Sequence, residues 1–341
     1  AKGWFKYDHR FKQPKIALTF RIETPKVYRS AKNLELAKLY EAMMQEGLNE
    51  LVYPIQIAGL SYGLSIEKKG VLLSLGGYSE RIGDLIKLVT KNLKEVKVDE
   101  QKFAYIKEAM IRGLKNKKLG QAYSRGGYYN YLMLLQEQYT DEEKLRALTP
   151  ITLSDVKAFA QTLYEQVYIT GMVHGNWSDD KARQSVDILL TALGSKPLPE
   201  NERFEKVVEV MPEGEKFRFS REVPDNNNSL AYAIQVGEKS LPLLAKTAII
   251  ASIVESDFYT QMRTNQQLGY IVWSFHQRVE NRIFFRLVIQ SSTHGPFEMS
   301  KRVNAWLAST EKLFSDLTDQ EFARHQQSLI VALEKEGDSI G

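Results

Sequence analysis

The side chains best suited to chemistry in this sequence are Arg263 and Tyr270, which lie in the polar and aromatic segment Asp257 to Ser274. An arginine guanidinium and a tyrosine hydroxyl both donate hydrogen bonds to oxygen. A pair of side chains that holds a carbonyl group, or the oxyanion developing from it, must do this. Tyr259 stands four residues before Arg263, so on a helix their side chains share a face. The segment therefore predicts a site that binds and polarises a carbonyl group.

A long apolar helix is expected to position these residues. It is predicted to begin near Leu241, to become polar after Val254 and to end at Gly269, because glycine commonly forms the C-terminal cap of a helix. Tyr270 follows this glycine directly, so we expect its phenol close to Arg263. The alternative is an aromatic core residue beside a solvated arginine.

The second half of the sequence repeats features of the first half in the same order, which favours a duplicated domain. Each half has a strand before a long helix, a Leu-x-Tyr hairpin start, a second hairpin strand and a further helix start. The matched segments are Ala17 to Glu23 with Ala231 to Glu238, Leu60-Ser61-Tyr62 with Leu268-Gly269-Tyr270, Gly70 to Ser79 with Arg282 to Ser292, and Asp99 to Phe103 with Thr318 to Phe322. Chance matching of short apolar strings is the alternative.

The repeat also bears on the arginine and tyrosine pair. Tyr62 occupies the position of Tyr270 in the first half, but the residue seven places before it is Ile55 and not an arginine. A tyrosine at this position can therefore be structural. The fold does not require the arginine, because the first half has the same predicted helix end without one. This favours a functional role for Arg263.

We predict an α+β fold of two tandem copies of an antiparallel sheet with helices packed on one face. The first unit would span residues 1–194 and the second 204–341. Residues 195–203 would be a linker, because this stretch has two prolines, four charged residues and little to bury. The second copy has no counterpart of the apolar strand Val167 to Asn176, so we expect it to be truncated. Either the chain was cut, or the missing residues belong to another chain or to a disordered tail.

The composition excludes several classes of site. The chain has 341 residues, a net charge of +4 and no cysteine, which rules out disulfides, cysteine-ligated zinc, iron–sulfur clusters and thiol catalysis. No two of its five histidines have the spacing that lets one helix present both to a metal. Nucleic acid and membrane are not expected partners, because no basic stripe stands out and the longest apolar stretch, Leu243 to Val254, is too short to cross a bilayer.

The ten residues from Arg263 to Val272, R-T-N-Q-Q-L-G-Y-I-V, resemble the R-T-x-x-Q-L-G-Y-x-V signature of pitrilysin and insulin-degrading-enzyme-like zinc metalloendopeptidases. Three more stretches resemble that family in the same order along the chain. WFKYDHRFKQPKIALTF resembles the start of the family's third domain, NELVYPIQIAGLSYGL its first long helix and hairpin, and VHGNWS its strand end. The resemblance extends over nearly the whole chain and places it in the C-terminal half of the family.

This resemblance implies an enzyme of four related domains in two halves that enclose a chamber in which peptides are cut. The family binds zinc through an H-x-x-E-H helix in its first domain, and that motif is absent here. Zinc would therefore belong to the N-terminal half, and this chain would bind none. By position, Arg263 and Tyr270 would reach the substrate carbonyl as catalytic residues, and Tyr259 would form an aromatic wall of the substrate pocket.

We therefore predict the non-zinc-binding C-terminal half of a zinc metalloendopeptidase, which encloses and binds peptide substrates and supplies transition-state hydrogen bonds. Its partners would be the peptide and the N-terminal catalytic half of the same protein, with a homo-oligomer also open. This chain alone is expected to be inactive. The alternative is a non-catalytic peptide-binding or scaffold subunit of the same fold. The absence of cysteine suits a periplasmic or secreted bacterial protein, and a cytoplasmic location stays open.

Overall fold

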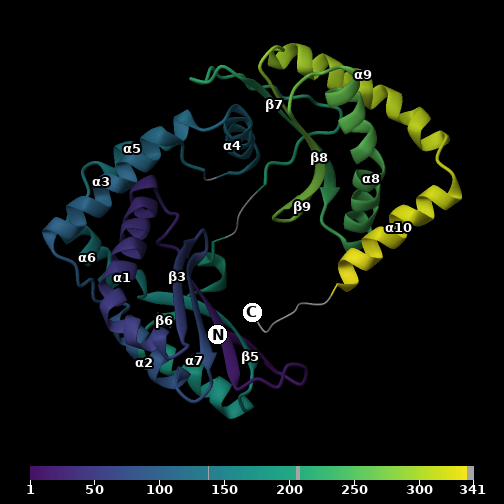
Figure 1. Ribbon diagram of the computed structural model, residues 1–341. Coiled ribbons are helices and arrows are strands. Elements are labelled where there is room, and N and C mark those ends of the chain that lie inside the picture. Colours follow the sequence, from purple (N-terminus) through teal and green to yellow (C-terminus); the bar gives the residue numbers. More distant parts are fainter. Residues whose placement is uncertain (137, 205–207, 336–341) are drawn as a thin grey trace. The chain divides into compact units, whose positions relative to one another are not determined.

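The computed structural model describes residues 1–136, 138–204 and 208–335, and its described residues fall into two compact units (Figure 1). The first unit contains residues 1–115 and 139–204. The second contains residues 116–136, 138 and 208–335. Residues 195–203 thus pack with the first unit, and a stretch from the first half of the sequence packs with the second. The boundary at 195–203 stays a prediction.

The first unit is built on one sheet with the strand order β1-β5-β2-β4-β3, and a short strand β6 pairs with β5. Strand β1 runs parallel to β5, whereas β5, β2, β4 and β3 pair antiparallel in turn. The strands are β1 (Lys2–Tyr7), β2 (Lys15–Glu23), β3 (Ser61–Glu67), β4 (Gly70–Tyr78), β5 (Gln166–Gly175) and β6 (Lys196–Pro197).

Alternating apolar residues on these strands build the core of the first unit. In β2 the side chains of Ile16, Leu18, Phe20 and Ile22 are buried, as expected for a strand with one face against helices. The helices are α1 (Ala31–Ile57), α2 (Ile82–Asn92), α3 (Glu100–Asn116), α5 (Asp141–Leu148), α6 (Leu153–Leu163) and α7 (Asp179–Leu193).

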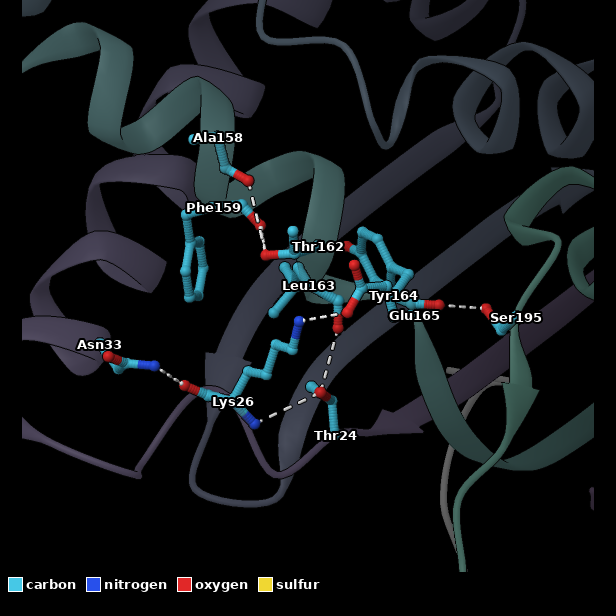
Figure 2. A network of polar contacts seen from close by, with 10 residues as sticks. All are labelled: Thr24, Lys26, Asn33, Ala158, Phe159, Thr162, Leu163, Tyr164, Glu165 and Ser195. Atoms are coloured by element: carbon cyan, nitrogen blue, oxygen red, sulfur yellow. Dashed lines mark hydrogen bonds and ion pairs between the residues drawn. The ribbon is translucent and has the colours of Figure 1, made fainter.

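Figure 2 shows how polar contacts fix the end of α6 in this unit. The hydroxyl of Thr24, just after β2, donates to the carbonyl of Leu163 at 3.0 Å. The Lys26 ammonium donates to the Glu165 carboxylate at 2.6 Å, and the Ser195 hydroxyl donates to the Tyr164 carbonyl. The start of the predicted linker is therefore tied to the core of the first unit.

The second unit has a sheet with the strand order β7-β9-β8, all antiparallel. Helices α8 and α9 contact one face, and their side chains meet the buried Phe285, Leu287 and Ile289 of β9. Helix α4 packs on the other face, where its Leu134 belongs to the same buried cluster as Phe284 of β9. The elements are α4 (Ala122–Leu134), β7 (Asn228–Glu238), α8 (Leu241–Tyr259), β8 (Ile271–Val279), β9 (Arg282–Ser291), α9 (Pro296–Ser315) and α10 (Asp319–Glu334).

The two units repeat the same order of elements, which confirms the predicted α+β fold. The order β2, α1, β3, β4, α2, α3 corresponds to β7, α8, β8, β9, α9, α10. In each sheet the second hairpin strand lies between the first hairpin strand and the strand that precedes the long helix. The buried pairs Leu64 with Leu73 and Val272 with Ile289 mark the same hairpin position. In the part of the second unit that the structure describes, β7 pairs only with β9, so no counterpart of β5 is present there.

No helix in the described ranges combines the length and the apolar character that crossing a membrane requires.

Candidate functional site

Helix α8 ends at Tyr259 and continues directly into a π-helical turn, Thr260–Asn265. The Gln266 amide donates to the carbonyl of Gln261, five residues earlier, at 3.1 Å. A π-turn holds more residues than an α-helical turn and is frequent at functional sites. The sequence pattern did not indicate this turn. Within the π-helical turn the Met262 side chain is fully buried in the core, and the neighbouring Arg263 is partly exposed.

Gly269 does not cap the helix, which corrects the sequence-based expectation. The turn ends at Gln266, and the left-handed residue is Gln267, with a φ of 50°. Gly269 instead lies against the backbone of β9, where a Cβ atom would stand 1.9 Å from the carbonyl oxygen of Gln290. Glycine is required here because any side chain would push the start of β8 away from β9.

The structure brings the three predicted site residues together. The Nη1 atom of Arg263 donates to the backbone carbonyl oxygen of Tyr270 at 2.8 Å. The guanidinium carbon lies 4.2 Å from the ring centroid of Tyr270 and 5.1 Å from that of Tyr259, within the range of cation–π attraction. Tyr270 is 80% exposed and Tyr259 is also exposed, so both rings are accessible to a ligand.

The contact between Arg263 and Tyr270 adds a role that sequence reasoning missed. We expected both side chains to donate to a ligand, but Arg263 also holds the main chain of Tyr270. Arginine carries five N–H groups, so this bond leaves donors for a carbonyl oxygen. Arg263 therefore orients the tyrosine and can still contribute positive charge at the same place.

The corresponding tyrosine of the first unit has a different environment. Tyr62 stands two residues before Leu64, as Tyr270 stands two residues before Val272, so the hairpin registers agree. Tyr62 packs against the core, and burial raises the pKa of its hydroxyl. Ile55, at the position of the arginine, also packs against that core. An exposed tyrosine held by an arginine is therefore a property of the second unit and not of the repeat.

A second polar cluster lies on the other face of the same sheet, under α4. Arg286 of β9 is only 5% exposed, and this burial lowers the pKa of its guanidinium. Its Nε atom donates to Oε1 of Gln277 at 3.0 Å, and Nη1 donates to Oδ1 of Asn130. Nε2 of Gln277 donates to the hydroxyl of Tyr131 at 2.6 Å. These bonds join α4 to β8 and β9, and the tyrosine-rich stretch of α4 was the only sequence signal for them.

The described residues do not fit a zinc site. Within the described ranges, no three His, Cys, Asp or Glu side chains are grouped so that they could hold a metal ion. Two histidines of the second unit have other contacts: Nδ1 of His325 lies 2.9 Å from the Ser252 hydroxyl, and Nδ1 of His294 lies 2.9 Å from the Thr293 hydroxyl. That the chain binds no zinc stays a prediction.

Two family models match parts of this chain. Residues 1–147 match the middle or third domain of peptidase M16, and residues 249–341 match the PQQ synthase PqqF-like C-terminal lobe domain 4. Human insulin-degrading enzyme is 30% identical over 338 residues, which are 97% of this chain and 33% of that protein.

Solved structures show the same fold. The crystal structure of pitrilysin matches with a TM-score of 0.90 at 22% identity, over 99% of this chain and 36% of that chain. A peptidase M16 inactive domain from Pseudomonas fluorescens matches with a TM-score of 0.68 at 16% identity, over 98% of this chain and 82% of that one. This chain spans about a third of the length of the curated relatives that it matches. It therefore belongs with the C-terminal half of peptidase M16 proteins of the pitrilysin and insulin-degrading-enzyme type.

Proposed function

We propose that this chain is the non-zinc-binding C-terminal half of a zinc metalloendopeptidase, in which it helps to enclose the peptide substrate and supplies hydrogen bonds to the transition state. The observation that carries the proposal is the exposed Tyr270 held by Arg263 in a chain related to peptide-degrading enzymes. Zinc, the general base and the attacking water would belong to the N-terminal half of the same protein.

The proposed chemistry of this half is stabilisation of charge. When water adds to the carbonyl carbon of a peptide bond, the carbon–oxygen double bond becomes a single bond and its oxygen becomes an oxyanion. The Tyr270 hydroxyl would donate a hydrogen bond to that oxygen, and the Arg263 guanidinium would add a second donor and a positive charge. Tyr259 would pack against the side chain next to the cleaved bond. Donors fixed before the reaction need no reorganisation when the charge develops.

The experiment that tests the proposal is peptide hydrolysis by the full-length protein carrying Tyr270→Phe. Phenylalanine keeps the ring over Arg263 and removes only the hydroxyl. We expect kcat to fall about 10²- to 10³-fold, the usual loss for one oxyanion donor, with a small change in KM. Tyr62→Phe is the matched control, since it removes the same hydroxyl at the same place in the repeat, and its activity should stay within a few-fold of wild type. Equal losses in both variants would refute the assignment.

A second candidate function is a non-catalytic peptide-binding or scaffold subunit, favoured by the shared fold of the peptidase M16 inactive domain. The two proposals differ in what precedes residue 1 in the full-length protein. An H-x-x-E-H helix encoded upstream would favour the enzyme, and its absence would favour the scaffold. A periplasmic or secreted location and assembly into a homo-oligomer remain predictions.

A further inference from the structure

Strand β8 is an edge strand that begins directly after Tyr270. It pairs with β9 on one side, and among the described residues no strand pairs with its other side. On such an edge the N–H and C=O groups of every second residue point away from the sheet and can pair with another chain. The nine residues of β8 offer about 30 Å of such backbone.

Two exposed aromatic side chains stand on the same face of this edge strand. Trp273 is 46% exposed and Phe275 is 38% exposed, and residues two apart in a strand point to the same side. The ring of Tyr123, from α4, lies edge-on to Trp273 with 5.1 Å between the ring centroids. The tryptophan is therefore held in place from within the second unit while almost half of its surface stays accessible.

The first unit shows that the fold does not require these aromatic residues. Its edge strand β3 has the same hairpin register, and Ser65 and Glu67 occupy the positions of Trp273 and Phe275. Glu67 forms an ion pair with Arg21 at 3.0 Å, and a charge of this kind discourages pairing at an edge. Residues 271–277 include no Asp, Glu, Lys, Arg or Pro, so this part of β8 lacks the usual protection, and the first charged residue of the strand is Arg278 near its end.

We propose that the β8 edge, with Trp273 and Phe275, binds an extended segment of the peptide substrate through strand pairing. The inference rests on the proposed function, because β8 continues from the residue assigned to the cleaved bond. The occupant is a peptide in the β conformation that carries an apolar or aromatic side chain at every second position. Its main chain would pair with β8, and its alternate side chains would pack on the two rings.

This arrangement predicts how substrates are chosen. Main-chain pairing is independent of sequence, so the edge would accept many peptides that can adopt an extended form. The two aromatic rings add a preference at alternate positions some residues away from the cleaved bond. Short peptides that end before β8 would lose this binding and would depend on the Arg263 and Tyr270 contacts alone.

The test uses the full-length protein and a fluorescein-labelled peptide of about 14 residues, long enough to lie along the strand. The peptide has a valine or phenylalanine at every second position, and binding is followed by fluorescence anisotropy in EDTA, with mass spectrometry to confirm that it stays intact. The variant Trp273→Ser with Phe275→Glu places the residues of β3 on the β8 edge, where the repeat shows them to be compatible with the fold. We expect its affinity to fall about tenfold or more.

The control is Phe297→Ala, which removes an exposed aromatic residue of the same unit at the start of α9 and should leave affinity within about twofold. A series of peptides with single N-methylated amides supplies the second measurement. Strand pairing predicts weaker binding when alternate amides are methylated and little change at the amides between them.

Unchanged affinity in the double variant, or a loss from N-methylation that does not alternate, would overturn the inference. So would a change of the double variant from dimer to monomer at unchanged peptide affinity, which would assign the edge to a second copy. The proposed function fails separately: full activity of Tyr270→Phe together with an alternating N-methyl pattern would remove the catalytic role and leave the peptide site standing. Loss of activity in Tyr270→Phe without an alternating N-methyl pattern would support the catalytic role and remove the peptide site on β8.

Discussion

The double substitution Arg263→Ala with Tyr270→Phe should show strong coupling, because Arg263 positions the residue whose hydroxyl Tyr270→Phe removes. Arg263→Ala deletes the 2.8 Å bond to the Tyr270 carbonyl and the cation–π contact at 4.2 Å. The exposed ring of Tyr270 would then sample other positions, and its hydroxyl would meet the oxyanion only part of the time.

The size of the effect follows from these contacts. A hydrogen bond with a charged donor contributes about 1.5–3 kcal/mol, and an exposed cation–π contact about 0.5–1 kcal/mol. Arg263 is partly exposed, so solvent screening favours the lower end, about 2 kcal/mol in all. That corresponds to about a 30-fold loss of kcat/KM for Arg263→Ala. In the Tyr270→Phe background the same change should cost only a few-fold, because the hydroxyl that it misplaces is already gone and only the contact of Arg263 itself with the oxyanion is lost.

The assay is a double-mutant cycle on kcat/KM for one peptide, measured in the full-length protein, with melting curves to confirm that all variants fold. We expect an interaction energy of about 1 kcal/mol or more. Arg218→Ala is the matched control, because it removes another arginine that lies over an aromatic ring, 5.5 Å from Phe297, and it should not couple to Tyr270→Phe. Losses that add within about 0.5 kcal/mol would refute a positioning role for Arg263.

Four further results are expected. Gly269→Ala should lower both the melting temperature and kcat, because its Cβ would stand 1.9 Å from the Gln290 carbonyl oxygen and displace the start of β8; an unchanged kcat would contradict this account. Arg286→Met should destabilise the protein by about 1–3 kcal/mol in urea titration, because the partly buried amide oxygens of Gln277 and Asn130 lose their donor. Hydrogen bonds from the backbone and hydroxyl of Thr318 lower the pKa of Glu321, so this carboxylate stabilises the start of α10 above its unfolded pKa and the contribution is lost as pH falls through its lowered folded pKa. Hydrogen exchange of α10 should therefore speed up in acid, and Glu321→Gln should remove that dependence on pH. Finally, the chain purified alone should retain no stoichiometric zinc after dialysis and should cleave no peptide, which elemental analysis and a peptidase assay can check.

The order of elements could be predicted because it depends on local patterns. The alternation in KIALTFRIE indicates a half-buried strand, and β2 has its apolar residues buried on one face. The sequences T-L-S-D from Thr152 and T-D-Q-E from Thr318 have the spacing of a capping box, and in the structure both form one, at the starts of α6 and α10. Such signals act within a few residues, so one sequence is enough to read them.

The parts that could not be predicted depend on residues far apart in the sequence. Glycine suits both a helix cap and a close approach of two backbones, and only the position of Gln290 decides between these roles for Gly269. The packing of α4 on the second sheet is similar: the amide of Tyr123 donates to Oε1 of Gln290, and Asn130 accepts from Arg286. Proximity of Arg263 and Tyr270 was expected, but the bond to the main-chain carbonyl was not, since every residue carries that acceptor.

The duplication separates what the fold needs from what the second unit adds. The two hairpins share strand order, register and buried pairs, so differences at matched positions are not required by the architecture. Three such differences are Arg263 in place of Ile55, Trp273 in place of Ser65 and Phe275 in place of Glu67. Arg263 lies beside Tyr270, just before β8, and Trp273 and Phe275 stand further along the same edge strand. The extended peptide that we propose would touch Tyr270 beside Arg263 and pair along β8 past Trp273 and Phe275, so one ligand would use all three differences.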